Sequence, residues 1–215
     1  ALMLLLSQLT MSGMSSYVYP NYYGSAAAQS LASLVGMAGT LLICAPTAVK
    51  LSQKFGKKEL ATAGAIVGAV AYLLCFLLRP SNPFVYVAFA AVATVSMGYF
   101  NTVVWAMITD VIDDTEVRTG VREDGTVYSV YSFARKLGQA ISSGLIGALL
   151  TMIGYSEATA FDPAVTGKIF NLSCLAPFAG FVALALIGEQ QYRLLLTKAD
   201  HESRYQRLFL MTTRL

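Results

Sequence analysis

The chain has 215 residues, of which 56% are hydrophobic and 13% are charged, and its formal net charge is +3. Soluble domains carry a charge on roughly 25% of their residues, so this composition excludes an ordinary soluble domain and indicates a membrane protein. The excess positive charge lies in short segments outside the apolar runs, so it indicates membrane topology and argues against nucleic-acid binding.

Six apolar runs are long enough to cross a bilayer as helices, which takes about 20 residues each. The first two lie in a stretch without any Asp, Glu, Lys or Arg, from Ala1 to Val49. The six predicted spans are residues 2–18, 27–49, 60–78, 84–109, 126–153 and 168–187. The sequence therefore predicts an all-α polytopic membrane protein with a cytoplasmic tail at residues 188–215.

Turn signals separate these spans. An aromatic cluster at residues 19–24 follows the first span and suits the headgroup interface. Residues 79–83, Arg-Pro-Ser-Asn-Pro, cannot continue a helix, so the fourth span is expected to begin near Phe84. Between the fourth and fifth spans we expect an acidic loop from Asp110 to Gly125.

Basic residues are more numerous on one side of the membrane than on the other, which predicts the orientation of the chain. Only Arg79 and Lys168 lie on the poorer side. The richer side includes the loop between the second and third spans, the acidic loop and the tail, with Lys50, Lys54, Lys57, Lys58, Arg118, Arg122, Arg193, Lys198, Arg204, Arg207 and Arg214. Because basic loops stay in the cytoplasm, we expect a multi-pass protein of the cell membrane with both termini cytoplasmic.

Lys136 lies inside the fifth predicted span. It is about ten residues into the span, or roughly 15 Å at 1.5 Å per residue, which is half of a hydrocarbon core of about 30 Å. A charge at that depth is costly and is usually retained for work on an ion or a polar substrate. A structural ion pair within the bundle is the alternative interpretation, and Arg135 is expected to snorkel from another face.

Polar side chains accompany Lys136 at helical spacing. Tyr128, Ser132 and Lys136 are four residues apart and share one helix face. On the fourth span, Asn101 and Trp105 are one turn apart. Hydrogen-bonding groups combined with an aromatic plate suit a polyhydroxylated substrate, although helix packing explains each of the four uncharged residues equally well when it is taken alone.

The acidic segment permits a second interpretation. Asp110, Asp113, Asp114 and Glu116 could bind Mg2+ as the Asp-rich loops of intramembrane transferases do. Such enzymes usually need more carboxylates than one short cluster offers, and a solvated loop paired with its own arginines is the commoner arrangement. The only histidine is His201 in the tail, and the three cysteines are scattered, so no catalytic triad and no zinc site are expected.

Residues 109–140 read T-D-V-I-D-D-T-E-V-R-T-G-V-R-E-D-G-T-V-Y-S-V-Y-S-F-A-R-K-L-G-Q-A. This stretch resembles the signature of the glycoside-pentoside-hexuronide:cation symporters, the melibiose-permease-like branch of the major facilitator superfamily. Residues 50–59, K-L-S-Q-K-F-G-K-K-E, resemble the basic turn between the eighth and ninth helices of that family.

The resemblance covers residues 2–187 and implies that the six spans are helices seven to twelve, one half of a twelve-helix fold. It implies that an N-terminal six-helix half, which carries the cation-binding carboxylates in that family, is missing from this chain. Lys136 matches a lysine beside the sugar and coupling-cation sites. Asn101 and Ser132 match positions near the sugar.

The resemblance also implies a cytoplasmic gate. Asp110 and Arg122 match a charged pair that helps to close the cytoplasmic side, and Asp113 and Glu116 belong to the same gate. Two departures are visible: residues 113–116 read D-D-T-E where the family usually has D-Y-G-E, and Arg135 stands where glutamine is common.

We therefore predict a non-enzymatic secondary transporter that moves a sugar or glycoside with Na+ or H+ by alternating access, and that needs no other cofactor. Its expected partners are the lipid bilayer, the sugar and the missing half, without nucleic acid. A Mg2+-dependent transferase built on residues 110–116 and a six-helix homodimeric transporter or channel are the alternatives.

Overall fold

The computed structural model describes residues 2–122 and 124–212. Throughout this part of the chain the regular structure is helical, and no strand is present. The elements are α1 (Leu2–Tyr17), η1 (Val18–Tyr22), α2 (Ala26–Gly39), η2 (Thr40–Cys44), α3 (Ala45–Phe55), α4 (Lys57–Leu78), α5 (Pro83–Thr119), α6 (Asp124–Met152) and α7 (Pro163–Thr212). The predicted all-α fold is confirmed.

Two π-helical turns join neighbouring α-helices into longer rods. The turn η1 continues α1 and contains Pro20, and η2 connects α2 to α3 directly before Pro46. A proline lacks the backbone N–H, and its ring clashes with the carbonyl four residues earlier. A wider π-helical turn relieves that clash without ending the helix. The nine elements therefore form six rods, one for each predicted span.

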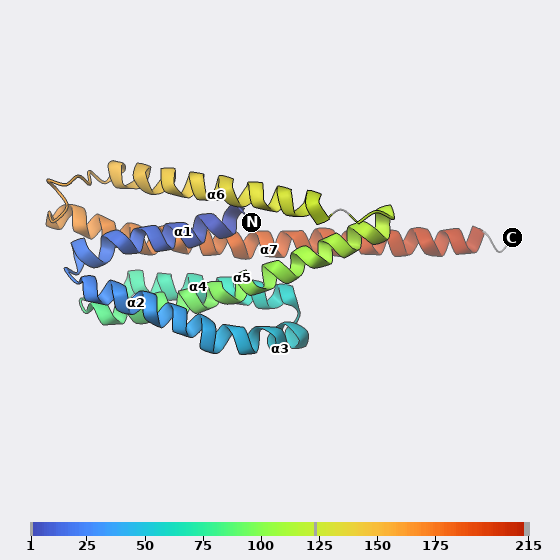
Figure 1. The fold of residues 1–215 in the computed structure, drawn as a ribbon, viewed down its shortest axis with the longest axis horizontal. Helices are drawn as coiled ribbons and strands as arrows, with labels where there is room; N and C mark the ends of the chain where they lie inside the picture. The colour runs from blue at the N-terminus through green and yellow to red at the C-terminus, as the bar shows by residue number, and fades with distance from the viewer. Residues whose placement is uncertain (1, 123, 213–215) are drawn as a thin grey trace.

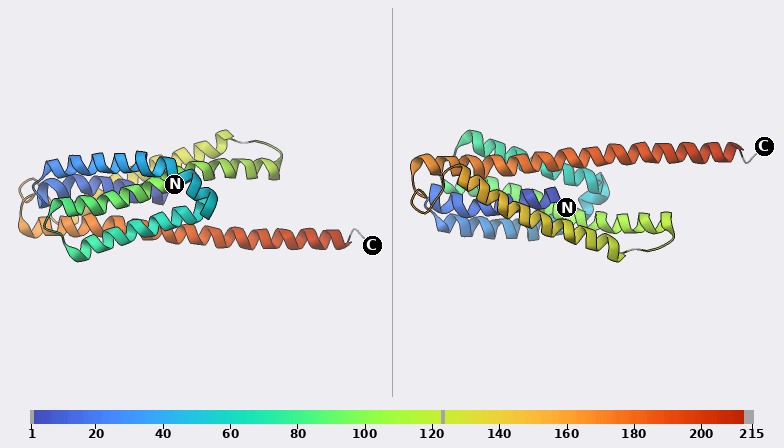
Figure 2. Two further views of the ribbon diagram at one scale, coloured as in Figure 1. Left: turned by 90° about the horizontal axis from the view of Figure 1, so that it is seen from below. Right: turned by 90° about the horizontal axis from the view of Figure 1, so that it is seen from above.

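The six rods run side by side along one direction (Figures 1 and 2). Helix α4 packs between α5 and α7, α1 packs against α7 and α6, and α2 packs against α5. The α3–α4 turn, the α5–α6 turn and the C-terminal end of α7 lie toward the same end of the bundle (Figure 1). The α1–α2, α4–α5 and α6–α7 connections lie at the other end.

Small residues let α4 approach its neighbours closely. A Cβ on Gly64 would lie 3.0 Å from the backbone oxygen of Ser96 on α5, and a Cβ on Gly68 would lie 2.6 Å from the ring of Phe181 on α7. Helices in a membrane associate through such close packing. The core of the bundle is therefore built on the α5–α4–α7 layer, and α1 and η1 add Leu4, Met11, Val18 and Tyr19 to it.

Within the described residues, four helical segments are long and apolar enough to cross a membrane: Ala26–Phe55, Lys57–Leu78, Pro83–Asp110 and Pro163–Ile187. The predicted first and fifth spans are not among them. Helix α1 has only 16 residues of α-helix, and α6 carries Arg135 and Lys136 near its middle. Both nevertheless run alongside the other four (Figure 2).

The acidic loop was predicted wrongly, because most of it is helix. Helix α5 continues through the acidic residues to Thr119 and ends only at Gly120, which has a φ of 72°. Glycine adopts this left-handed conformation without the penalty that a Cβ imposes. With 37 residues α5 is about 55 Å long, so its last turns extend beyond a hydrocarbon core of about 30 Å.

The segment after residue 187 is also helical, since α7 runs without interruption to Thr212. No glycine or proline follows Gly188, so no residue in the sequence stops the helix there. At its other end α7 begins at Pro163, earlier than the predicted residue 168. The side chain of Asp162 caps that end by accepting a hydrogen bond from the backbone N–H of Ala164 at 2.9 Å.

Candidate functional site

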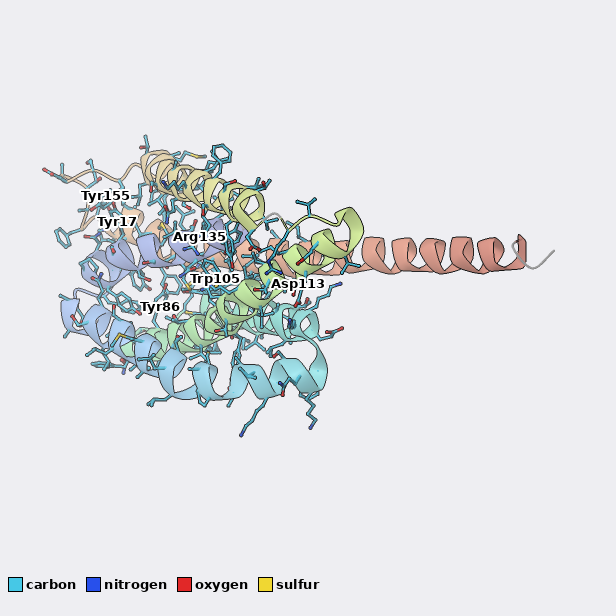
Figure 3. The ribbon with its side chains drawn as sticks, turned by 45° about the vertical axis from the view of Figure 1, so that its right-hand side comes forward. Tyr17, Tyr86, Trp105, Asp113, Arg135 and Tyr155 are labelled. Carbon is cyan, nitrogen blue, oxygen red and sulfur yellow. The ribbon has the colours of Figure 1, made fainter. Side chains whose placement is uncertain are left out.

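Helix α6 lies at the edge of the bundle and packs mainly against α1. Gly138, Ser142 and Leu150 are its buried residues, and a Cβ on Gly13 of α1 would clash with Ile146. At the end of the bundle near the α6–α7 connection, the rings of Tyr155 and Tyr17 meet edge to face with centroids 5.3 Å apart (Figure 3). One side of α6 is therefore covered by this chain, and the rest is open.

The open side of α6 is divided into a polar and an apolar part. Successive residues are rotated by about 100° on an α-helix, so five polar side chains fall within a sector of about 80°. We call them the α6 polar stripe: Tyr128, Ser132, Lys136, Gln139 and Ser143, all exposed. Beyond them lie exposed apolar residues: Val130, Phe133, Leu137 and Ile141. An apolar face suits lipid, whereas the polar stripe needs a polar environment.

The predicted residues Lys136, Ser132 and Tyr128 therefore share one face, as the spacing indicated. Among the residues that the structure describes, none forms a hydrogen bond or ion pair with the side chain of any of the three. The ammonium of Lys136 is thus uncompensated within the described chain. The structural ion pair considered for Lys136 is not formed there.

Asn101 and Trp105 connect α5 to its neighbours. The side-chain amide of Asn101 donates a hydrogen bond to Gln8 Oε1 on α1 at 3.3 Å. Trp105 is 48% exposed, and its ring meets that of Tyr131 on α6 with centroids 5.4 Å apart and an interplanar angle of 65°. Residues of α1, α5 and α6 thus border one side of the bundle.

Arg135 occupies this border as well. Its guanidinium carbon lies 5.7 Å from the ring centroid of Trp105 and 5.8 Å from that of Tyr131. Figure 3 shows Arg135 and Trp105 next to each other. The guanidinium therefore lies within cation–π distance of two aromatic rings.

The sequence analysis missed polar residues of α1 on the side of the bundle that α1, α5 and α6 border. Gln8, Ser12 and Ser16 are four residues apart on α1, and Gln29 of α2 donates a hydrogen bond to Ser16 Oγ at 3.5 Å. The spacing of these polar residues inside a charge-free span was the available signal. No sequence pattern singled out Tyr131, because its aromatic partner, Trp105, lies on a different helix, α5.

The predicted pair of Asp110 and Arg122 is not formed. Asp110 instead accepts hydrogen bonds from Lys57 Nζ at 2.6 and 2.7 Å. Asp110 is still within the α5 helix and lies beside the start of α4. Both side chains are more than a third exposed, so this ion pair contributes no more than about 1 kcal/mol.

Arg122 pairs with the end of its own helix. After α5 ends at Gly120, the guanidinium turns back to Glu116 at 2.7 Å and Asp113 at 3.2 Å, and its Nε reaches Asp124 at 3.0 Å. The hydrogen bonds to Glu116 and Asp124 raise the pKa of Arg122 further above its ordinary value. The four predicted gate residues therefore form two separate ionic groups at one end of the bundle.

The Mg2+ interpretation gains no support from the geometry. Asp114, one of the four residues of that interpretation, lies outside the described side chains. Among the side chains that the structure describes, no group of three or more His, Cys, Asp or Glu is placed to hold a metal ion. The carboxylates of Asp113 and Glu116 face Arg122.

Comparison with known proteins decides the family. Residues 1–194 match the family model described as "MFS/sugar transport protein". The match covers the first five rods and the part of α7 up to residue 194. The chain belongs to this family. It is accordingly a multi-pass membrane protein of the major facilitator type. No solved structure matches it.

Several curated relatives are similar. The chain is 33% identical over 169 residues to the "Putative sulfoquinovose importer" of Escherichia coli (strain K12), covering 75% of this chain and 35% of that protein. It is 30% identical to the "Glucuronide carrier protein homolog" of the same organism, covering 75% and 37%. It is 36% identical to the "Uncharacterized symporter YjmB" of Bacillus subtilis (strain 168), covering 65% and 30%. The chain thus spans about a third of the length of these relatives, which are named as transporters and not as enzymes.

Proposed function

We propose that this chain is the C-terminal half of a symporter that moves a sugar or glycoside together with Na+ or H+ by alternating access. The observation that carries the proposal is the α6 polar stripe, which includes Lys136, a cation without a counter-charge among the described residues. A cation at bilayer depth needs a carboxylate or water nearby. An N-terminal six-helix half packed over this face would provide both.

The comparisons support the same proposal from another direction. The family model is one of sugar transport, and the relatives are named for an importer, a carrier and a symporter. Their greater length leaves room for a second half. Transporters of this fold bind their substrate near the bilayer midplane, between the halves.

The side of the bundle bordered by α1, α5 and α6 offers suitable contacts for a sugar. The amide groups of Asn101 and Gln8 supply donors and acceptors for hydroxyl groups, and Ser132 adds a hydroxyl on α6. The half-exposed ring of Trp105 supplies an apolar surface for a sugar ring. Lys136 pairs with carboxylates of the other half, and binding of the sugar or the cation changes that pairing.

The ionic end of the bundle is the cytoplasmic gate in this proposal. It contains Asp110, Asp113, Glu116 and Arg122, and both termini lie on the cytoplasmic side. The basic α3–α4 turn lies toward the same end of the bundle (Figure 1), as the predicted orientation requires.

Uptake measurements test the proposal. Cells that express the complete gene are given radiolabelled glycosides, pentosides and hexuronides, with and without a Na+ gradient and at two external pH values. We expect accumulation of a sugar driven by one of the two ion gradients, and its loss in Lys136→Ala. Lys54→Ala, which removes an exposed lysine from the end of α3, is the matched control and is expected to leave uptake intact. Unchanged uptake and ion coupling in Lys136→Ala would contradict the role of this lysine.

A further inference from the structure

Two tyrosine hydroxyl groups in the core of the bundle have no hydrogen-bond partner in the described part of the chain. Tyr19 on η1 and Tyr72 on α4 are each 1% exposed, and neither phenol oxygen meets a donor or an acceptor there. A buried hydroxyl group without a partner lowers the stability of the fold, and native structures rarely leave one unpaired. The two phenols therefore need a partner.

Both phenols border the same small region of the core. They belong to one hydrophobic cluster, to which η1, α4, α5 and α7 contribute. The ring of Tyr19 meets that of Tyr86 on α5 edge to face with centroids 5.4 Å apart, and the ring of Tyr72 stacks 6.3 Å from that of Phe181 on α7. The two phenol groups are close enough to interact electrostatically with each other and with the thiol of Cys75.

The neighbouring polar side chains are already paired with one another. Cys75 forms a side-chain hydrogen bond with Cys174. Tyr86 forms one with Ser173, whose hydroxyl also donates to the backbone oxygen of Phe170 at 2.8 Å. A thiol is in any case a weak donor and a weak acceptor. The partner of Tyr19 and Tyr72 is therefore not a side chain of this cluster.

Charge and position indicate which molecule fits there. The surrounding segments, residues 18–22, 60–78, 83–109 and 163–187, contain no Asp or Glu, so a cation would lack a counter-charge. Tyr72 lies six residues before the end of α4, or about 9 Å, and η1 lies at that same end of the bundle (Figure 1). Solvent is thus near, and buried waters typically bond to polar groups that would otherwise be unsatisfied.

We infer that the hydroxyl groups of Tyr19 and Tyr72 bind a shared internal water molecule, which links η1 to α4 inside the core of the bundle. Each phenol donates its O–H to the water oxygen, and the two hydrogens of the water remain for nearby acceptors. This site is separate from the α6 polar stripe and does not depend on the identity of the substrate. Tyr19 and Tyr72 are therefore ligands of water as well as packing residues.

Radiolytic hydroxyl labelling of the complete protein in nanodiscs tests the inference. X-rays generate radicals from bound water, and these radicals modify the side chains beside it. Mass spectrometry measures the labelling rates of Tyr19 and Tyr72, with Met97 as the internal control, because its thioether is readily oxidised but its side chain is 2% exposed. We expect both tyrosines to be labelled several-fold faster than Met97.

The variants Tyr19→Phe and Tyr72→Phe, alone and combined, give a second measurement. Each single variant removes one hydrogen bond to the water and should lower the thermal unfolding midpoint by about 1–4 °C. The double variant should lose less than the sum of the two, because both single variants weaken the same water site. Tyr22→Phe is the matched control on η1, since its side chain is only partly buried, and its midpoint should not change.

Three outcomes would overturn the inference. The first is labelling of the two tyrosines no faster than that of Met97. The second is a single variant at least as stable as the unmodified protein, because removing an unsatisfied hydroxyl group from a dry core removes its desolvation cost. The third is an additive loss in the double variant, which would assign separate partners to the two phenols. None of these measurements depends on sugar uptake, so the proposed function is tested independently.

Discussion

The α5–α4–α7 layer and the open side of α6 belong to the same bundle but differ in what their residues contact. Along α4, small residues and Tyr72 are buried against α5 and α7, and the ring of Tyr72 stacks near that of Phe181 with centroids 6.3 Å apart. Along α6, the side chains of Tyr128, Ser132 and Lys136 are exposed and form no hydrogen bond or ion pair with the described residues. The first region is packed and holds the helices together, whereas the second is not covered by the described part of this chain.

A bulky residue in the packed region should produce the largest change in stability. Gly68→Leu places a side chain where even a Cβ would lie 2.6 Å from the buried ring of Phe181. Overpacking of this kind costs about 1–3 kcal/mol, occasionally more. Thermal unfolding of the detergent-solubilised protein should show a clear decrease in its midpoint.

The matched control is Gly125→Leu near the start of α6, where a Cβ meets nothing within 4 Å. Its unfolding midpoint should stay close to that of the unmodified protein. If the two variants were equally stable, the α5–α4–α7 layer would not be the tightly packed region of the bundle.

Removing the ring of Trp105 should affect binding more than stability. Trp105→Ala removes the half-exposed indole ring and, with it, the cation–π contact to Arg135. Since aromatic contacts contribute about 0.5–1.5 kcal/mol each, we expect KM for the sugar to rise about 2- to 10-fold with little change in the unfolding midpoint. The control Trp105→Phe should retain most of the affinity. If the unfolding midpoint of Trp105→Ala fell as far as that of Gly68→Leu, Trp105 would belong to the packed region instead.

The ion pair between Lys57 and Asp110 should give the smallest effect. It joins the start of α4 to α5 at 2.6 Å, but both partners are substantially exposed. A double-mutant cycle with Lys57→Ala and Asp110→Asn should give a coupling energy below about 1 kcal/mol. That coupling should disappear in about 1 M salt, where screening acts over roughly 3 Å. A larger coupling that persists in salt would show that this contact is shielded from solvent, as a closed gate would require.

Local signals predicted the helices better than their ends. The Arg79–Pro83 turn is present, with Arg79 in the left-handed conformation and Asn82 capping α5. The predicted start of α7, residue 168, is five residues later than the observed start at Pro163. Asp162 as the N-cap and Pro163 in the first turn were the signals in the sequence for the true start. The acidic residues after Asp110 were assigned to a loop because charge was read as solvent exposure, yet a solvated segment remains helical until a residue such as Gly120 ends it.

The sequence by itself determined the apolar rods, their turns and the division of α6 into polar and apolar faces, because each depends only on residues a few positions apart. The tertiary structure alone decided which side chains meet. Asn101 bonds to Gln8, 93 residues away, and Lys57 pairs with Asp110 across 53 residues. Such contacts depend on how each helix is rotated and shifted against its neighbours, which follows from the packing of the whole bundle and not from any local spacing.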